Sequence, residues 1–482
     1  MRITPFDIPL LNSEICQYLS CKDLAHCVQV SKAWTAWFTP ALWRDLDWPD
    51  ILTSTRQQEH IQGVRCISMR QMGPILALQS CTNLQRLDFK DHDGDQLQVL
   101  QVLGKISTLR HLQITLVLED DNICQQWIRV LEALPRLESL ILKSGQLADG
   151  KFIQKMLQLC IGYKRLAFTF IDEETYARNE QDYQDTRAAI ERMPDMQPRE
   201  LSLNSRCEHY ETNIFQPLLD RCPRIEKLTL CSTLTLQHLS KALKEKRLAQ
   251  LRHLAVRTYA KQSCLAELLS YDEGGLESFE VATRIGKQVA QSLIQYHHQS
   301  LRRLRFGQTG ILLSALSEVM TALPNLRSLE ATVLPLYEGD ITNIPLDKHW
   351  VCLGLRVLRL KVETRYYHGT VGSTEWVGSM HKRGIDYVFS ETAKMKSLQD
   401  LSIGCRQKGL YLMQSGYLTQ LGDLKQLEVF DLASTPPEEF GRDEALWMAS
   451  NWPRLIRVQS HGASEIFRQT LLEERPLLEI VN

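Results

Sequence analysis

The chain has 482 residues, of which 44% are hydrophobic and 23% are charged, as is usual for a soluble globular protein. Lys and Arg total 56 and Asp and Glu total 57, so the formal net charge is −1. The chain as a whole therefore lacks the net positive charge that would attract nucleic acid or acidic lipid. A single compact domain of this length would be unusual, so we expect several domains or a repeat array.

The start of the chain, MRITPFDIPLLNSE, has neither a long apolar stretch nor a small-residue cleavage site, so we expect no secretory signal. No apolar run approaches the roughly 18 residues of a membrane-spanning helix. The thirteen cysteines are scattered through apolar patterns, which is typical of reduced, buried thiols. We therefore expect a cytoplasmic or nuclear protein that binds neither membrane nor nucleic acid.

The first fifty residues predict a small bundle of short helices. Leu11, Ile15 and Leu19 recur at i, i+4 and i+8 and form one stripe of a helix. Ser20 and Ser31 stand where the N-caps of two further helices are expected.

The third of these helices carries a dense aromatic pattern. Trp34 and Phe38 stand at i and i+4 and share a face. Thr39-Pro40 is typical of an N-cap followed by proline at the first helical position, which predicts a separate short helix over 41–44. A bundle of about 40 residues is marginal alone, so we expect it to need a partner or the neighbouring domain.

The order of these residues resembles an F-box over roughly residues 6 to 48. The match runs through an early Pro, an apolar helix, D-L, C-x-x-V-S-K-x-W and L-W-R-D. The resemblance implies docking on a Skp-type adaptor and, through it, on a cullin. It implies these adaptor-contacting residues: Pro9, Leu10, Leu11, Ile15, Leu19, Leu24, Val30, Trp34, Leu42 and Trp43.

From residue 64 onward one phrase keeps returning: leucine, two variable residues, leucine, one variable residue and an apolar residue. Fifteen copies, some weaker than others, start at residues 64, 84, 109, 137, 163, 198, 225, 251, 276, 301, 326, 355, 398, 427 and 455. Most successive copies lie 25 to 29 residues apart, the period of leucine-rich repeats built from a strand and a helix. The last four positions of the phrase alternate as a strand does, and stretches such as 95–106, 123–134 and 235–246 have helical periodicity.

These patterns predict an α/β fold. We expect a leucine-rich-repeat solenoid, a horseshoe with a parallel sheet on its concave face and helices outside, over residues 64–482. A small all-α F-box over 1–50 and a junction over 51–63 precede it. Two longer intervals predict insertions near 171–197 and 361–396.

An F-box followed by such repeats is similar to the F-box/leucine-rich-repeat proteins, and most of all to their fungal members. That family implies a substrate-recognition subunit of an SCF-type cullin-RING ubiquitin ligase. The F-box would dock on the adaptor, and the repeats would hold the target protein.

The variable strand positions predict the target-binding face. Across the middle and late repeats they form a basic run, which consists of Lys227, Arg257, Arg303, Arg305, Arg359 and Lys361. Because Arg pairs two-pronged with carboxylate and phosphate, this run would suit an acidic or phosphorylated segment. An ordinary solvated strand face without a specific ligand is the alternative.

No motif for catalysis or for binding a metal or cofactor stands out. The acidic stretch at 91–95 fails as a calcium loop, since Gln96 and Val102 stand where Gly and a bidentate Glu are needed. We therefore expect no cofactor, no metal and no catalytic residue. Two alternatives stay open: a leucine-rich-repeat scaffold outside ubiquitin ligation, and an enzyme with its site in the 361–396 insertion.

Overall fold

The structure, a computed structural model, consists of two compact units, residues 1–225 and 226–482. It describes residues 9–46, 64–69, 75–90, 95–118, 121–144, 150–170, 180–205, 207, 210–231, 234–271, 275–307, 310–335, 348–363, 374–405, 416–431, 440–459 and 463–481. No helix in these ranges is both long and apolar enough to cross a membrane.

The first unit opens with three helices and continues with alternating strands and helices. Its elements are α1 (Pro9–Tyr18), α2 (Cys21–Val30), α3 (Lys32–Leu42), β1 (Asp45–Leu46), β2 (Cys66–Met69), the 3-10 helix η5 (Ile75–Ser80), β3 (Arg86–Phe89), α4 (Gln96–Leu103), β4 (His111–Leu116), α5 (Asp121–Ala133), β5 (Ser139–Ser144), α6 (Gly150–Leu159), β6 (Arg165–Phe170), α7 (Glu180–Glu191), β7 (Glu200–Ser205), the π-helical turn η6 (Glu211–Phe215) and α9 (Gln216–Asp220).

The second unit repeats the alternation of strand and helix. Its elements are β8 (Lys227–Leu230), α10 (Leu234–Lys244), β9 (His253–Val256), α11 (Gln262–Ser270), β10 (Ser278–Val281), α12 (Lys287–His297), β11 (Arg303–Phe306), α13 (Leu313–Ala322), β12 (Ser328–Pro335), β13 (Val357–Glu363), α15 (Thr374–Thr392), β14 (Asp400–Cys405), α16 (Tyr417–Gln420), the 3-10 helix η7 (Leu421–Asp423), β15 (Val429–Asp431), α17 (Arg442–Asn451), β16 (Arg457–Gln459), α18 (Glu465–Glu474) and β17 (Glu479–Val481).

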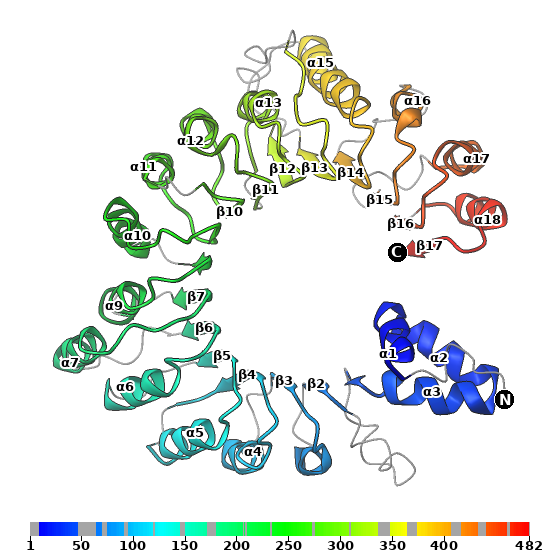
Figure 1. The fold of residues 1–482 in the computed structure, drawn as a ribbon. Coiled ribbons are helices and arrows are strands. Elements are labelled where there is room, and N and C mark those ends of the chain that lie inside the picture. The colour runs from blue at the N-terminus through cyan, green and yellow to red at the C-terminus, as the bar shows by residue number, and fades with distance from the viewer. Residues whose placement is uncertain are drawn as a thin grey trace. The chain divides into compact units, whose positions relative to one another are not determined.

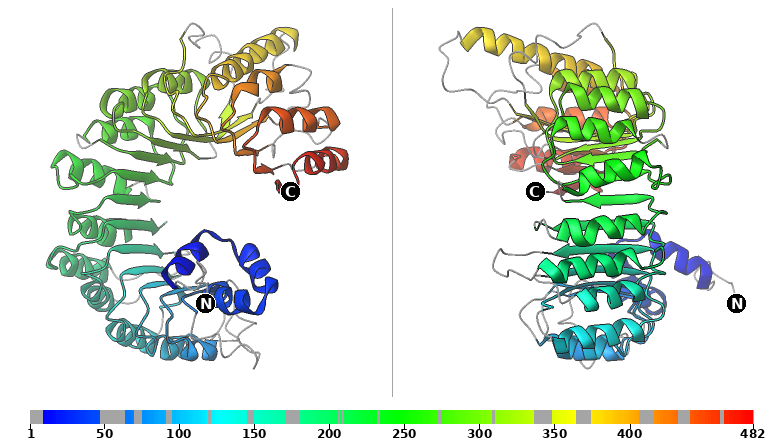
Figure 2. Two further views of the ribbon diagram at one scale, coloured as in Figure 1. Left: turned by 45° about the vertical axis from the view of Figure 1, so that its right-hand side comes forward. Right: turned by 90° about the vertical axis from the view of Figure 1, so that its left-hand side faces the viewer.

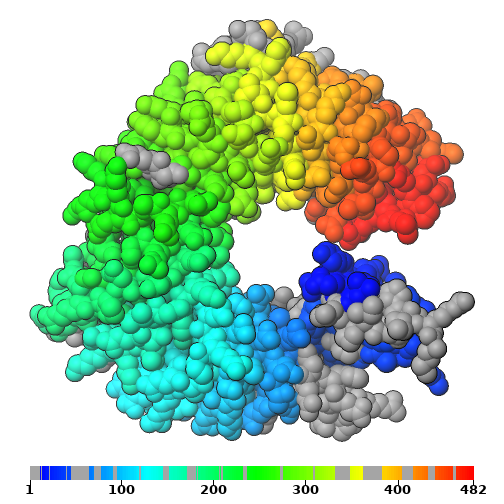
Figure 3. Space-filling view, viewed as in Figure 1, coloured from blue at the N-terminus to red at the C-terminus, as the bar shows by residue number. Residues whose placement is uncertain are grey.

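Within each unit the strands form one parallel ladder, in which each strand pairs with the next along the chain. The helices form a second layer on one side of each ladder, as Figures 1 and 2 show. The space-filling view shows the chain colours as successive bands within each unit, since a repeat packs mainly against its neighbours in sequence (Figure 3). The predicted leucine-rich-repeat solenoid is confirmed.

Each of the fifteen phrases lies on a strand, from β2 to β16. The second leucine of the phrase points into the core, as Leu87, Leu112 and Leu140 illustrate with almost no exposed surface. Burying one such side chain contributes about 1.5–3 kcal/mol, and the stacking of successive leucines makes the strands one continuous core. The sequence analysis missed β17, because Asn482 stands where the last apolar residue of the phrase is expected.

The helical module, residues 9–46, begins with capped helices. Ser20 and Asp23 form a capping box at the start of α2, in which the Ser20 hydroxyl accepts the amide of Asp23 and the Asp23 carboxylate accepts the amide of Ser20. Ser31 caps α3 by accepting the amide of Trp34 at 3.2 Å. Both caps lie where the sequence predicts them.

The predicted separate helix over 41–44 is wrong, since α3 continues through Pro40 to Leu42. The proline lies in the last turn, where its missing amide removes one hydrogen bond without breaking a long helix. The amide of Trp43 then closes the turn by donating to the Thr39 carbonyl at 3.1 Å.

Backbone hydrogen bonds join the helical module to the first repeat. Strand β1 pairs in parallel with β2, with Asp45 opposite Cys66 and Leu46 opposite Ile67. The carbonyl of Arg44 accepts the amide of Cys66 at 3.0 Å. The chain therefore passes from helices into sheet without a free hinge between Leu42 and β1.

Both predicted insertions are described in part, since residues 171–179 and 364–373 lie outside the described ranges. Helix α7 covers 180–191, with Tyr183, Thr186 and Ile190 buried in the helical layer. Helix α15, in the second insertion, runs for 19 residues, and its last two turns are largely buried.

The buried cysteines are expected to resist alkylation. Burial raises the pKa of Cys81 to about 11 and of Cys352 to about 12 and raises those of Cys160 and Cys222 further, so little thiolate forms near pH 8. In the folded chain, mass spectrometry should find these four thiols labelled at least tenfold more slowly than the half-buried Cys264. Equal labelling before and after denaturation would contradict this expectation.

Candidate protein-interaction surfaces

The helical module has a small core of its own. Cys16, Leu24 and Phe38 are its buried residues. The ring of Trp34 packs on Phe38 with centroids 5.3 Å apart. Eight further apolar side chains pack partly buried around them, namely Ile15, Leu19, Cys27, Val28, Trp34, Trp37, Ala41 and Leu42. So small a core leaves much of the module's apolar surface in solvent.

Among the described side chains of the module, three large apolar ones are exposed. Leu11 and Tyr18 are seven residues apart and so lie on the same face of α1, where they are 41% and 85% exposed. Val30, at the end of α2, is 62% exposed. Exposed apolar side chains of this number on so small a module favour a surface that a partner covers.

The predicted adaptor-contacting residues differ in their exposure. Leu11 and Val30 are exposed, whereas Leu24 is only 2% exposed and shapes the surface from beneath. Pro9 and Leu10 begin α1. The partly buried members are Ile15, Leu19, Trp34, Leu42 and Trp43. The exposed Tyr18 lies outside the predicted set, although its spacing of seven from Leu11 places it on the same face of the helix.

The strand face of the second unit, meaning the side chains at the first, third and fifth strand positions, carries the predicted basic residues. Lys227, Arg303, Arg305 and Arg359 are exposed on β8, β11 and β13, Arg257 is exposed just after β9, and Lys361 is half-buried on β13.

Acidic side chains on neighbouring strands pair with three of these arginines. Arg257 lies 3.0 Å from Glu280 and Arg305 lies 3.5 Å from Glu330. Arg359 pairs with Asp400 through two contacts, at 2.5 and 3.3 Å, which raise its pKa.

The pairing follows from the strand register. Glu280, Arg305, Glu330 and Arg359 stand opposite one another on consecutive strands and alternate in sign. Alternate charges on neighbouring strands attract each other, so this row is largely neutralised within the chain. The strand face is therefore a mixed charge ladder, in which acidic side chains such as Glu280 and Glu330 interrupt the predicted basic run.

The strands also carry two hollows. One, of ≈ 220 Å³, lies in the first unit over Arg86, His111 and Arg165. The other, of ≈ 600 Å³, lies in the second unit beside Arg252 and His253. Charged and polar groups line both, which suits a polar ligand or peptide better than an apolar small molecule.

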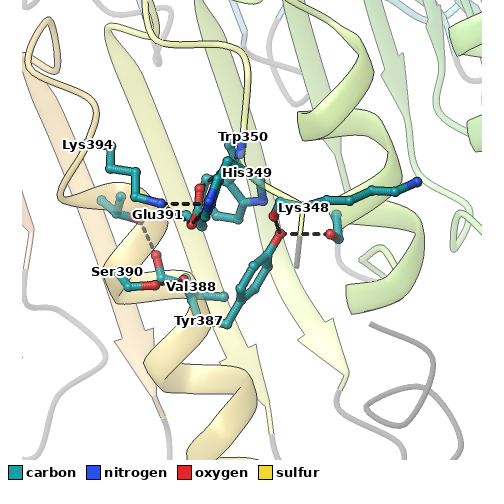
Figure 4. A network of polar contacts seen from close by, with 10 residues as sticks. Lys348, His349, Trp350, Tyr387, Val388, Ser390, Glu391 and Lys394 are labelled. Atoms are coloured by element: carbon teal, nitrogen blue, oxygen red, sulfur yellow. Dashed lines mark hydrogen bonds and ion pairs between the residues drawn. The ribbon is translucent and has the colours of Figure 1, made fainter. Parts of the chain in front are cut away.

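A polar network ties α15 to the segment before β13 (Figure 4). The Glu391 carboxylate is buried, and its Oε2 accepts the amide of Trp350 at 2.9 Å. Its Oε1 accepts the Lys394 ammonium at 2.5 Å and lies 3.0 Å from His349 Nδ1. Burial opposes ionisation, but these hydrogen bonds outweigh it and hold the pKa of Glu391 below its usual value.

The second half of the network involves Tyr387, whose hydroxyl donates to the Lys348 carbonyl at 3.0 Å and lies 3.0 Å from Ser317 Oγ on α13. The ring of Tyr387 also meets Trp350 edge-on, with centroids 5.8 Å apart. The Glu391 carboxylate and the Tyr387 hydroxyl are both occupied by other parts of the chain, which favours a structural role for these two groups. Among the described residues no three His, Cys, Asp or Glu side chains gather as metal ligands would.

No family model and no curated protein matches the sequence. Solved structures with a similar fold include the yeast Rad7 and Elc1 complex, at 12% identity and TM-score 0.41, covering 98% of this chain and 91% of that one. A Bacteroides fragilis protein matches at 14% identity and TM-score 0.29, over 54% and 66% of the two chains. The leucine-rich-repeat protein LegL7 of Legionella pneumophila matches at 11% identity and TM-score 0.32, over 78% and 97%.

Proposed function

We propose that this protein is a substrate receptor of an SCF-type ubiquitin ligase. Its helical module docks on a Skp-type adaptor, and through it on a cullin, while its repeats hold a target protein. The protein would act where the ligase does, in the cytoplasm or nucleus. It needs no catalytic residue, because holding the target near a charged ubiquitin carrier raises the local concentration of acceptor lysines.

One observation carries the adaptor half of the proposal. The module whose residues resemble an F-box exposes Leu11, Tyr18 and Val30, and its described side chains include three buried core residues. Desolvating such side chains supplies binding energy, and covering them would stabilise the module as well. The ladder between β1 and β2 supports the same proposal, since it fixes the docking module to the repeats.

Binding to the adaptor tests the proposal directly. We expect the wild-type chain to capture a purified Skp-type adaptor, and the double variant Leu11→Asp, Val30→Asp to lose at least tenfold in affinity by calorimetry. Both side chains are exposed, so the folded state should survive and the circular dichroism spectrum should be unchanged.

Leu477→Asp is the matched control, because Leu477 is 99% exposed and lies in the last repeat, outside the helical module. It removes an exposed leucine of the same kind and should leave adaptor capture unchanged. Equal binding by wild type and by the double variant would reject the adaptor half and leave a leucine-rich-repeat interaction scaffold.

A further inference from the structure

Four consecutive repeats of the first unit recur in the second unit. The phrases that start at 84, 109, 137 and 163 correspond to those that start at 225, 251, 276 and 301, at offsets of 138 to 142 residues. The middle two phrases are almost the same in wording, LRHLQI and LESLIL against LRHLAV and LESFEV. The similarity includes solvent-facing positions, where packing in the leucine core does not determine the residue type.

The first strand position shows the correspondence most clearly. In the first unit Arg86, His111, Ser139 and Arg165 stand directly opposite one another on β3 to β6. We call them quartet 1.

In the second unit Lys227, His253, Ser278 and Arg303 stand opposite one another on β8 to β11. We call them quartet 2. Both quartets run in the order cation, histidine, serine, arginine, with the outer cations exposed and the histidine half-buried.

The residues just before these strands are duplicated too. Arg110 pairs with Glu138 at 3.5 Å in the first unit, and Arg252 pairs with Glu277 at 2.9 Å in the second. Each quartet therefore lies beside an ion pair of the same kind at the start of the same two strands.

The two histidines have equivalent electrostatic surroundings. Burial lowers the pKa of His111, and so do three neighbouring arginines, against one glutamate that raises it. The charged groups that face it from the adjoining strands are Arg86, Glu138, Arg165 and Arg110.

Burial also lowers the pKa of His253, again with three cations lowering it and one glutamate raising it. Those groups are Arg303, Glu277, Lys227 and Arg252, each the counterpart of one around His111. In quartet 2 the Arg303 guanidinium lies 3.5 Å from His253 Nδ1. Each imidazole is thus neutral near pH 7 and can take up a proton if an anion arrives.

Each hollow of the strands lies at one of these histidines. All four members of quartet 1 line the hollow of ≈ 220 Å³. His253 is the one member of quartet 2 that lines the hollow of ≈ 600 Å³, together with the charged residues Arg252, Arg302, Glu226 and Glu277.

We propose that each quartet binds one oxyanion group of the target, a phosphate monoester or a side-chain carboxylate, so that the target carries two such groups. The proposal rests on the target-binding half of the proposed function and names the chemistry that it recognises.

Geometry supports this ligand. Adjacent strands lie about 4.8 Å apart, so the outer cations are roughly 14 Å apart at the backbone, with a hydrogen-bonding histidine and serine between them. Long Lys and Arg side chains can close over that gap onto an anion, which in quartet 1 competes with Glu200, 3.4 Å from Arg165 Nε. The anion stabilises the imidazolium form, so binding is coupled to proton uptake by the histidine.

The test uses the full-length chain with ring-labelled histidine and N-acetyl-phosphoserine amide as the probe. His111→Gln and His253→Gln assign the two ring signals in the NMR spectrum. We expect the probe to shift both signals and to raise the pKa of both rings.

Arginine variants localise the binding. Arg86→Gln should weaken about tenfold the probe affinity that the His111 signal reports, and leave the affinity reported by His253 unchanged. Arg303→Gln should weaken the affinity reported by His253 and leave that reported by His111 unchanged. The matched control is Arg457→Gln, which also removes an arginine from a first strand position but lies outside both quartets. Absence of any shift in either ring, or equal effects of all three variants on both rings, would overturn the proposal.

A second titration with N-acetyl-glutamate amide separates the two sources of the oxyanion. Tighter binding of the phosphoserine probe identifies a phosphorylated target, and tighter binding of the glutamate probe identifies an acidic one. Adaptor capture by Arg86→Gln and Arg303→Gln should equal that of wild type. Loss of anion binding therefore stays distinguishable from failure of the docking module.

Discussion

Replacing Trp452 by alanine is expected to lower the free energy of unfolding of the C-terminal repeats by about 3–5 kcal/mol, the range for deleting a buried aromatic side chain. Trp452 has no exposed surface, meets Phe430 and Trp447 edge-on with centroids 4.8 and 5.2 Å apart, and donates from Nε1 to the Leu421 carbonyl at 3.1 Å. Its removal leaves a cavity between β15 and α17 that the stiff strands cannot close.

Hydrogen exchange should show where this loss falls. Because repeats contact mainly their neighbours, we expect faster amide exchange over residues 440–481 and unchanged exchange in the first unit. Trp452→Phe is the control, since it keeps a ring against Phe430 and loses the indole hydrogen bond, for a cost of about 1 kcal/mol. Uniformly faster exchange through the whole chain would show that the repeats unfold as one cooperative unit.

Replacing Glu391 by alanine should cost about 2–3 kcal/mol, because it leaves the buried amide of Trp350 without an acceptor. The exposed His349 and Lys394 regain water when the carboxylate is lost, so the ion pairs add little to this figure. The segment before β13 would then be released from α15.

The contribution of Glu391 depends on pH. Its pKa is lower in the folded chain than in the unfolded chain, so its ionised contacts stabilise the fold fully above the usual glutamate pKa. That stability is lost as the pH falls through the lowered value. We therefore expect the difference between wild type and Glu391→Ala, measured by denaturant unfolding, to be constant from pH 6 to 8 and to shrink towards pH 3.

Glu391→Gln separates the contribution of the hydrogen bond from the Trp350 amide from that of the ionised carboxylate. An amide oxygen can still accept the Trp350 amide, so this variant should lose less stability than Glu391→Ala, and its loss should be the pH-dependent part. A difference between wild type and Glu391→Ala that does not change between pH 3 and 7 would contradict the assigned ionisation.

The fold could be predicted from the sequence because its signal is local and repeated. A strand in each repeat follows from the alternation of Leu87 and Phe89, or of Leu254 and Val256, and fifteen copies make the period unmistakable. The end of α3 could not be predicted in the same way. Thr39-Pro40 favours a helix start locally, and only the packing of the whole helix against α2 decides that α3 continues.

The candidate sites were predictable in part. The exposed positions of Arg305 and Arg359 follow from strand alternation. Their acidic partners Glu330 and Asp400 come from other repeats, so pairing required the register of the ladder. The network around Glu391 joins residues about forty positions apart, which lie before and after the phrase that starts at 355, and no sequence pattern places those residues together.

The pairing of β1 with β2 also protects a sheet edge. Without β1, strand β2 would present a row of unpaired amides and carbonyls, which is a template for association with a second chain. The two-residue strand β1 covers the first half of that row and offers little edge of its own. Deleting the helical module would thus remove the proposed adaptor docking and at the same time create an aggregation-prone sheet edge. Point substitutions therefore separate docking from solubility more cleanly.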